Sequence, residues 1–243
     1  MRTLVSFAAA VTLGAGCGTA GAAATCRAES GAERTHLVEL YTSEGCSSCP
    51  PAEAWLRTLR GKPGIATLEY HVDYWDSRDF RDPYADARHA ARQRAYARAH
   101  RINTVTPQVL LDGQAWKNWP KGAPPEPVDA TAPALALEAT IEGSRVRAKA
   151  AFAGSGDQEL FLALAEDGVS NEVRAGENRG KRLEHDAVVR AFAGPLVSAT
   201  AETGLELPPD AVAANVRLVG FVRDARDDRV LGVAVLPLSA CAR

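Results

Sequence analysis

Residues 36–59 read HLVELYTSEGCSSCPPAEAWLRTL, and this stretch decides the fold that the sequence predicts. From His36 to Tyr41 apolar and polar side chains alternate, which is typical of a β-strand. From Pro50 to Leu59 the apolar side chains recur at the spacing of one buried helix face. Cys46 and Cys49 therefore lie between the end of a strand and the first turn of a helix.

The alternation of strands and helices continues to about residue 120. Ile65–Val72 and residues 109–111 have the pattern of strands, and Tyr84–Ala99 is rich in the helix formers alanine and arginine. Strand, helix, strand, helix and strand in this order predict a parallel or mixed sheet with helices on its faces. Residues 114–132 are then rich in proline, which predicts a linker.

The second half of the chain has a different pattern, with short alternating runs at close spacing. These runs predict strands over residues 134–141, 146–152, 159–166, 187–192, 216–222 and 230–237. The expected fold class is therefore an α/β domain over residues 25–120, followed by an antiparallel β-sandwich-like domain over residues 121–243, α+β overall.

The first 24 residues have the pattern of a secretory signal peptide. A positive start at Arg2 precedes a short apolar run, and the small residues Gly21–Ala24 follow it. That run is too short to span a bilayer as a helix, so we expect a periplasmic or secreted protein with no stable membrane span. A lipid anchor at Cys17 is the less favoured alternative, because Gly14 stands where a lipobox usually has leucine.

Removal of a signal peptide would leave four of the five cysteines. An even number of cysteines in an exported protein favours disulfides. Cys26 and Cys241 lie near the two ends of the mature chain, and chain ends often lie close together in space. We therefore expect a structural disulfide between Cys26 and Cys241, with two free thiols as the alternative.

The pair Cys46 and Cys49 has the clearest chemical meaning. At the start of a helix the positive end of the dipole lowers the pKa of a thiol, and the thiolate is the attacking species in disulfide exchange. Cys46 is therefore the expected nucleophile and Cys49 the resolving thiol. A permanent disulfide and a metal site remain as alternatives. The metal site is disfavoured, because no second Cys-x-x-Cys or Cys-x-x-His pair supplies further ligands.

These residues resemble the thioredoxin superfamily and, more closely, a family of secreted bacterial thioredoxin-like proteins of unknown function. The likeness rests on ELYTSEGCSSCPPAE at residues 39–53, HVDYWD at 71–76, RQRAYA at 92–97 and TPQ at 106–108, and it resumes near residue 176. The resemblance implies a thioredoxin-like fold for the first domain. It also implies that Pro107 is a cis-proline facing the redox pair, and that Thr106 supplies backbone groups that hold a substrate chain.

The HVDYWD stretch is a second candidate site, at the end of the second expected strand. Ligand and catalytic groups gather at such strand ends in open α/β sheets. One interpretation is that Asp73 or His71 moves protons during exchange, with His71 and Trp75 beside the substrate. The alternative is that these side chains satisfy buried groups and fill the core. His185 and Asn178, in a glycine-bounded loop of the second domain, could reach the redox cleft across the domain interface, but a structural turn is the favoured interpretation.

The sequence thus predicts a periplasmic thiol–disulfide oxidoreductase that acts on protein or peptide thiols and disulfides and needs no bound cofactor or metal. The formal net charge of −2 gives no electrostatic footprint for nucleic acid. Two alternatives stay open. One is a binding or accessory module in which Cys46–Cys49 is permanent, and the other is a copper(I) chaperone that uses both thiolates. The direction of electron flow is left open. The two residues between the cysteines tune the redox potential, and here they are Ser47-Ser48 where thioredoxin has Gly-Pro.

Overall fold

The computed structural model describes residues 24–31, 33–124, 133–154 and 156–241. In these residues the chain is mostly β, with two α-helices and several short 3-10 turns. The helices are α1 (Pro50–Arg57) and α2 (Ala87–Ala99). The strands are β1 (Thr25–Glu29), β2 (His36–Thr42), β3 (Ile65–His71), β4 (Gln108–Leu111), β5 (Gln114–Ala115), β6 (Leu135–Glu142), β7 (Arg145–Phe152), β8 (Gln158–Glu166), β9 (Val169–Glu172), β10 (Arg182–His185), β11 (Val188–Leu196), β12 (Thr200–Glu206), β13 (Val216–Asp224) and β14 (Val230–Pro237).

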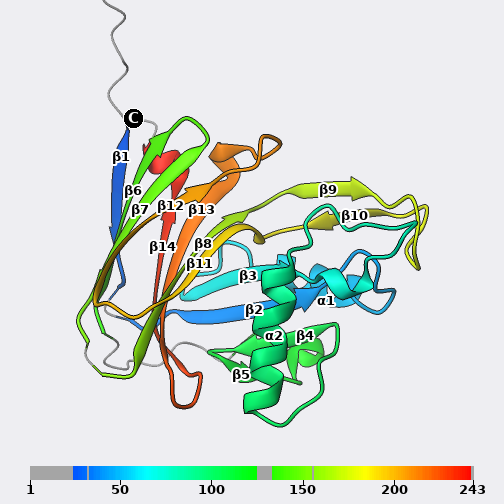
Figure 1. Cartoon of the computed structure of the whole chain (residues 1–243), viewed down its shortest axis with the longest axis horizontal. Coiled ribbons are helices and arrows are strands. Elements are labelled where there is room, and N and C mark those ends of the chain that lie inside the picture. The colour runs from blue at the N-terminus through cyan, green and yellow to red at the C-terminus, as the bar shows by residue number, and fades with distance from the viewer. Residues whose placement is uncertain (1–23, 32, 125–132, 155, 242–243) are drawn as a thin grey trace, which may run out of the picture.

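Two large sheets organise the described part of the chain (Figure 1). The larger has eight strands in the order β14-β13-β8-β11-β3-β2-β4-β5, and the smaller has four in the order β1-β6-β7-β12. The smaller sheet packs against the β14–β11 end of the larger one, and both helices lie at the other end. β9 and β10 form an antiparallel hairpin that extends from the larger sheet past α1.

The expected fold class is wrong in its main feature. β11, from the second half of the chain, pairs in parallel with β3, from the first half, at Val188 and Glu69. The Glu69 N–H also donates to the Ala187 carbonyl over 2.8 Å. Strands from both sides of residue 120 therefore share one sheet, and the mostly β architecture is not a thioredoxin-like α/β domain followed by a sandwich. The local pattern specifies β3 and β11 as strands, but it does not say which distant strand will pair with the open edge of β3.

The larger sheet buries a different set of side chains on each face. On one face, Leu37 and Tyr41 of β2 pack with Phe161 and with residues of α2. On the other face, Val38 and Leu40 pack with α1. The strand register places Glu69 opposite Leu40 and His71 opposite Thr42, and side chains of paired residues point to the same face. The face that packs with α1 therefore also carries the polar side chains of β3.

Arg92 of α2 connects the two halves of the chain on the opposite face. Its Nη1 atom lies 2.8 Å from Oε1 of Glu39, whose side chain is fully buried in β2. The guanidinium also donates to the Tyr41 hydroxyl. Its Cζ atom lies 5.3 to 5.7 Å from the ring centroids of Tyr70, Phe161, Phe192 and Phe221, so strands of both halves surround it.

The two ends of the described chain are joined as expected. Cys26 of β1 and Cys241 form a disulfide, which confirms that predicted pairing. Most of the expected signal peptide, including Cys17, lies outside the described residues. No helix in the described part of the chain is long and apolar enough to cross a membrane.

Replacing Arg92 with methionine should destabilise the protein by about 3–5 kcal/mol, because it leaves the Glu39 carboxylate buried without its counter-charge. The double variant E39L/R92M should recover much of that loss, because it removes both charges. Urea unfolding followed by circular dichroism measures both effects. R94M is the matched control, because Arg94 is exposed on the same helix. An R92M variant as stable as R94M would contradict this role.

Removal of the terminal disulfide in C26S/C241S should lower the free energy of unfolding by roughly 4–5 kcal/mol in the loop-entropy model, because the bridge closes a very long loop in the unfolded chain. Urea unfolding of wild type and of C26S/C241S gives the comparison. Equal midpoints for the two proteins would show that the ends are held together by packing alone.

Candidate functional site

The second disulfide lies where β2 ends and α1 begins. Cys46 and Cys49 are bonded, with their Cα atoms 5.5 Å apart, and both residues are fully buried. The Cys46 N–H donates to the Ser43 carbonyl over 3.0 Å and fixes the turn. The Sγ atom of Cys46 lies 3.4 Å from the Ser48 hydroxyl oxygen, which is a potential donor to a thiolate at that position.

The Thr106–Pro107 loop is held beside the Trp75 segment. The peptide bond between Thr106 and Pro107 is cis. The indole N–H of Trp75 donates to Oγ1 of Thr106 over 2.8 Å. From α2, the Gln93 side-chain amide donates to the Val105 carbonyl over 2.8 Å. These contacts bring three of the predicted residues, Trp75, Thr106 and Pro107, into one corner of the molecule.

An open groove runs from this loop across the end of β4. It has a volume of about 540 Å³, and its lining includes Ile102, Val105, Pro107, Trp116 and Trp119. Ile102 and Val105 are among the exposed large apolar side chains of the protein, at 39% and 49% exposure. The groove therefore offers apolar surface beside Pro107, which suits an extended polypeptide segment.

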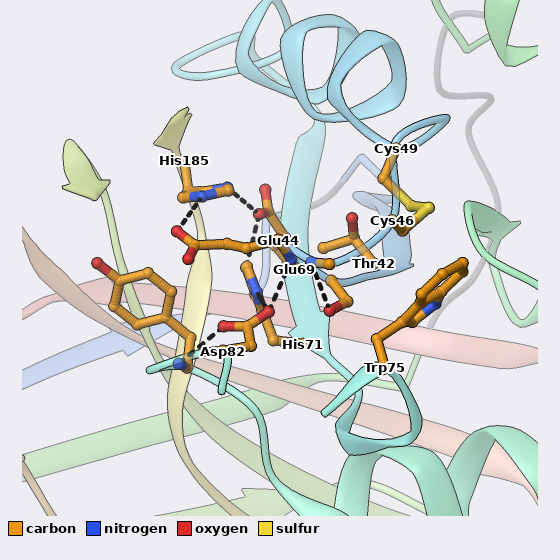
Figure 2. Close-up of polar contacts among 12 residues, drawn as sticks. Thr42, Glu44, Cys46, Cys49, Glu69, His71, Trp75, Asp82 and His185 are labelled. Carbon is orange, nitrogen blue, oxygen red and sulfur yellow. Dashed lines mark hydrogen bonds and ion pairs between the residues drawn. A yellow bond between two sulfur atoms is a disulfide. The ribbon is translucent and has the colours of Figure 1, made fainter. Parts of the chain in front are cut away.

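A network of buried acidic and imidazole side chains lies on the other side of the β2 end (Figure 2). His71 of β3 contacts two carboxylates, with Nδ1 2.8 Å from Oδ2 of Asp82 and Nε2 2.9 Å from Oε1 of Glu69. His185 of β10 contacts the same Glu69 oxygen through Nδ1 at 2.8 Å, and its Nε2 lies 3.3 Å from Oε1 of Glu44. Two histidines thus share one carboxylate oxygen.

Glu53 connects this network to α1. Its Oε1 accepts a hydrogen bond from the Thr42 hydroxyl over 2.5 Å, and its Oε2 lies 3.8 Å from Nδ1 of His185. The Glu53 N–H donates to the Cys49 carbonyl, so this carboxylate lies one helical turn after the disulfide. The buried network therefore begins one turn along α1 from the cysteine pair.

Two effects shift the pKa values of these side chains: burial disfavours the charged form, and contact with an opposite charge favours it. Burial and the nearby Glu69 raise the pKa of Glu53 to about 7. Burial opposes ionisation of His185, but the Glu69 and Glu44 carboxylates outweigh it and raise the pKa of that imidazole to about 9. Burial likewise opposes ionisation of Asp82, and contact with His71 outweighs it and lowers the pKa of Asp82 to about 2. The network is thus a set of paired buried charges.

The loop between β9 and β10 covers the cysteine turn. The side-chain amide of Asn178 donates to the carbonyls of Glu44 and Cys46, both over 2.9 Å. The Ser47 N–H donates to the Glu177 carboxylate over 3.0 Å. Asn171 of β9 donates to the other oxygen of the Glu44 carboxylate over 2.7 Å. A structural turn was the favoured interpretation of Asn178, and reach to the cysteine pair was the alternative. The side chain contacts the Cys46 turn, as the alternative expected.

The predicted site residues thus divide into two groups. Trp75 lies on the same side of the β2 end as the Cys46–Cys49 disulfide, and it binds Thr106 next to Pro107, whereas His71 points into the buried network. Asp73 joins neither group, because among the described residues its carboxylate makes no hydrogen bond or ion pair. Its predicted role in proton transfer stays a prediction.

Sequence reasoning missed most of the buried network. Glu44, Glu69 and Asp82 were not singled out, although Glu69 lies in the apolar strand sequence IATLEYH. A charged residue inside a strand that is otherwise buried on both faces was the available signal, because such a residue needs a partner. Asp82 gave no comparable signal, since it lies in a charged loop.

Comparison with known proteins identifies a family and one similar structure. The family model "Protein of unknown function (DUF1223)" matches residues 37–223. A structural-genomics crystal structure from Agrobacterium tumefaciens is similar at a TM-score of 0.57 and 24% identity, over 84% of this chain and 95% of that one, and this likeness shows the fold alone. No curated protein matches the chain. The expected membership of the thioredoxin superfamily is therefore wrong, and the chain belongs to the DUF1223 family of unknown function.

Proposed function

We propose that the protein is an exported thiol–disulfide oxidoreductase whose reacting pair is Cys46 and Cys49. The observation that carries the proposal is the position of their disulfide, between the end of β2 and the first turn of α1. There the positive end of the helix dipole favours a thiolate. Pro50 and Pro51 offer no N–H groups, so the Ser48 hydroxyl is the nearby hydrogen-bond donor to the sulfur of Cys46.

The reaction is a reversible exchange between two pairs of cysteines. A substrate thiolate attacks Sγ of Cys46, the Cys46–Cys49 bond breaks, and Cys49 leaves as a thiolate that takes up a proton. A second substrate thiolate then attacks the mixed disulfide and releases Cys46. The net products are a substrate disulfide and a protein dithiol, and the reverse sequence reduces a substrate disulfide. No bound cofactor takes part.

The groove beside Pro107 supports a polypeptide substrate. Its apolar lining, with Ile102 and Val105 exposed, suits an extended chain segment that passes Pro107. Export is supported by the signal-peptide pattern and by the two disulfides, since disulfides persist in oxidising compartments. The net charge of −2 gives no support to a nucleic-acid partner.

Both sulfurs are buried, so exchange requires the turn to open. The groups that hold it closed are Glu177 and Asn178, which bind Ser47 and Cys46. The same burial favours one alternative, a binding or accessory module in which the disulfide is permanent. The copper(I) chaperone would require prior reduction of the pair.

The reduction potential of Cys46–Cys49 should lie between roughly −120 and −270 mV, the range of exchange enzymes. Incubation of the mature protein in glutathione buffers, alkylation of free thiols and peptide mass mapping give the value. Cys26–Cys241 in the same molecule is the internal control and should stay oxidised throughout. A Cys46–Cys49 pair that stays oxidised below about −300 mV would establish the permanent disulfide.

Replacing Asn178 with alanine should speed reduction of the disulfide by dithiothreitol several-fold, because it frees the carbonyls of Glu44 and Cys46 from the cover. The measurement is the rate of thiol release with time. N118A is the matched control, because Asn118 is exposed and caps no helix through its side chain. Equal rates for N178A, N118A and wild type would show that the loop does not limit access.

A further inference from the structure

We propose that Glu69, His71 and His185 bind a zinc ion inside the protein, with Glu53 as the fourth ligand. One oxygen of Glu69 and one ring nitrogen of each histidine lie within 4.8 Å of one another. All three side chains are completely buried. Glu69 of β3 and His185 of β10 lie 116 residues apart in the chain, so a bound ion would cross-link its two halves.

The outer contacts of the two histidines match those of metal ligands. A metal-bound imidazole usually gives its second ring N–H to a carboxylate, which fixes the tautomer and the ring orientation. Asp82 takes this position at Nδ1 of His71, and Glu44 takes it at Nε2 of His185. The ring nitrogens that face Glu69 would be the metal ligands, and an ion would displace the protons through which they now contact that carboxylate. Both histidines are oriented in this way, and both face the Glu69 carboxylate.

The outer carboxylates are themselves fixed in position. Asp82 accepts backbone N–H donors from Glu44 and Tyr84, over 2.8 and 3.0 Å. Glu44 accepts the Asn171 amide. The two groups that orient the histidines are therefore held by other residues, as in a pre-organised binding site.

A separate observation concerns the other oxygen of the Glu69 carboxylate. The second oxygen of Glu69, Oε2, is buried and has no hydrogen-bond partner among the described residues. A buried acceptor oxygen without a hydrogen-bond donor destabilises the folded protein. A divalent ion between Glu69 and the two histidines would compensate that carboxylate.

The distances require little rearrangement. Zinc binds nitrogen and oxygen at 2.0–2.2 Å, so two ligand atoms of a tetrahedral site lie about 3.3 Å apart. Glu69 Oε1 now lies 2.9 Å from His71 Nε2 and 2.8 Å from His185 Nδ1, so these two pairs need to separate by only a few tenths of an ångström. Oε2 of Glu53 lies 3.8 Å from His185 Nδ1 but outside the group of three, so its side chain would have to move toward the ion to become the fourth ligand.

Ligand chemistry favours zinc over the hard cations. Magnesium and calcium prefer sites made only of oxygen, whereas two imidazoles and carboxylates suit zinc. Four protein ligands with no open position are typical of a structural zinc site. The ion would hold β10, and with it the loop of Asn178, against β3 and α1. This inference is independent of the proposed redox function, because neither cysteine is a ligand.

The test is the metal content of the full mature protein. Wild type, E69Q, H185Q, H100Q and C46S/C49S are refolded from guanidinium, with their remaining disulfides intact, in about 50 µM zinc chloride, well above the dissociation constant of a structural site. The proteins are then dialysed, and their zinc content is measured by plasma mass spectrometry. Wild type, H100Q and C46S/C49S should each hold about one zinc per chain, and E69Q and H185Q at least ten-fold less. His100 is the matched control, because it pairs with Asp228 away from the network.

A second readout on wild type alone covers the case in which the variants fail to fold. Refolding in cobalt(II) should give the visible absorption of a tetrahedral nitrogen and oxygen site, without thiolate charge-transfer bands, and zinc should raise the melting temperature relative to a chelator. Wild type without bound zinc or cobalt would overturn the proposal, as would equal zinc in E69Q and wild type. Wild type that retains another divalent metal more strongly than zinc would overturn the assignment to zinc. Loss of zinc in C46S/C49S would move the site to the cysteines.

Discussion

The burial of Glu69 in the middle of the larger sheet is the constraint on which the rest of the structure depends. Its backbone joins β3 to the segment that leads into β11, so it lies where the two halves of the chain meet. Its carboxylate has no access to water and must find partners inside the protein. His71 comes from the same strand, and His185 is brought by the β9–β10 hairpin. The position of that hairpin is therefore linked to the burial of one charge.

The opposite face of the sheet repeats this arrangement with a different pair. Glu39 and Arg92 meet beneath α2, and aromatic side chains from β3, β8, β11 and β13 surround the guanidinium. Each face therefore contains a buried ionic contact at the junction between the two halves of the chain. Such contacts stabilise the fold only when both partners are present, so they select the one strand order that brings the partners together.

Glu44 connects the buried network to the disulfide. Its carboxylate contacts His185 and Asn171, and its backbone carbonyl accepts the same Asn178 amide that holds Cys46. The hairpin that completes the network thus also closes the cysteine turn. Access to the sulfurs and order in the network are coupled through this residue, because any movement of the β9–β10 loop breaks contacts on both sides.

Sequence by itself determined the local elements and the local chemistry. The expected helix from Pro50 and the strands near residues 36, 65, 109, 159, 216 and 230 are present, because each depends on a short periodic pattern, and the Cys26–Cys241 bridge was also correct. Only the tertiary structure decided that β11 joins β3, that β9 and β10 form a cover, and that Glu44, Glu53, Glu69, Asp82 and two histidines share one interior. The reason is physical: these contacts join residues up to 141 positions apart, and no local pattern encodes which distant partner neutralises a buried charge.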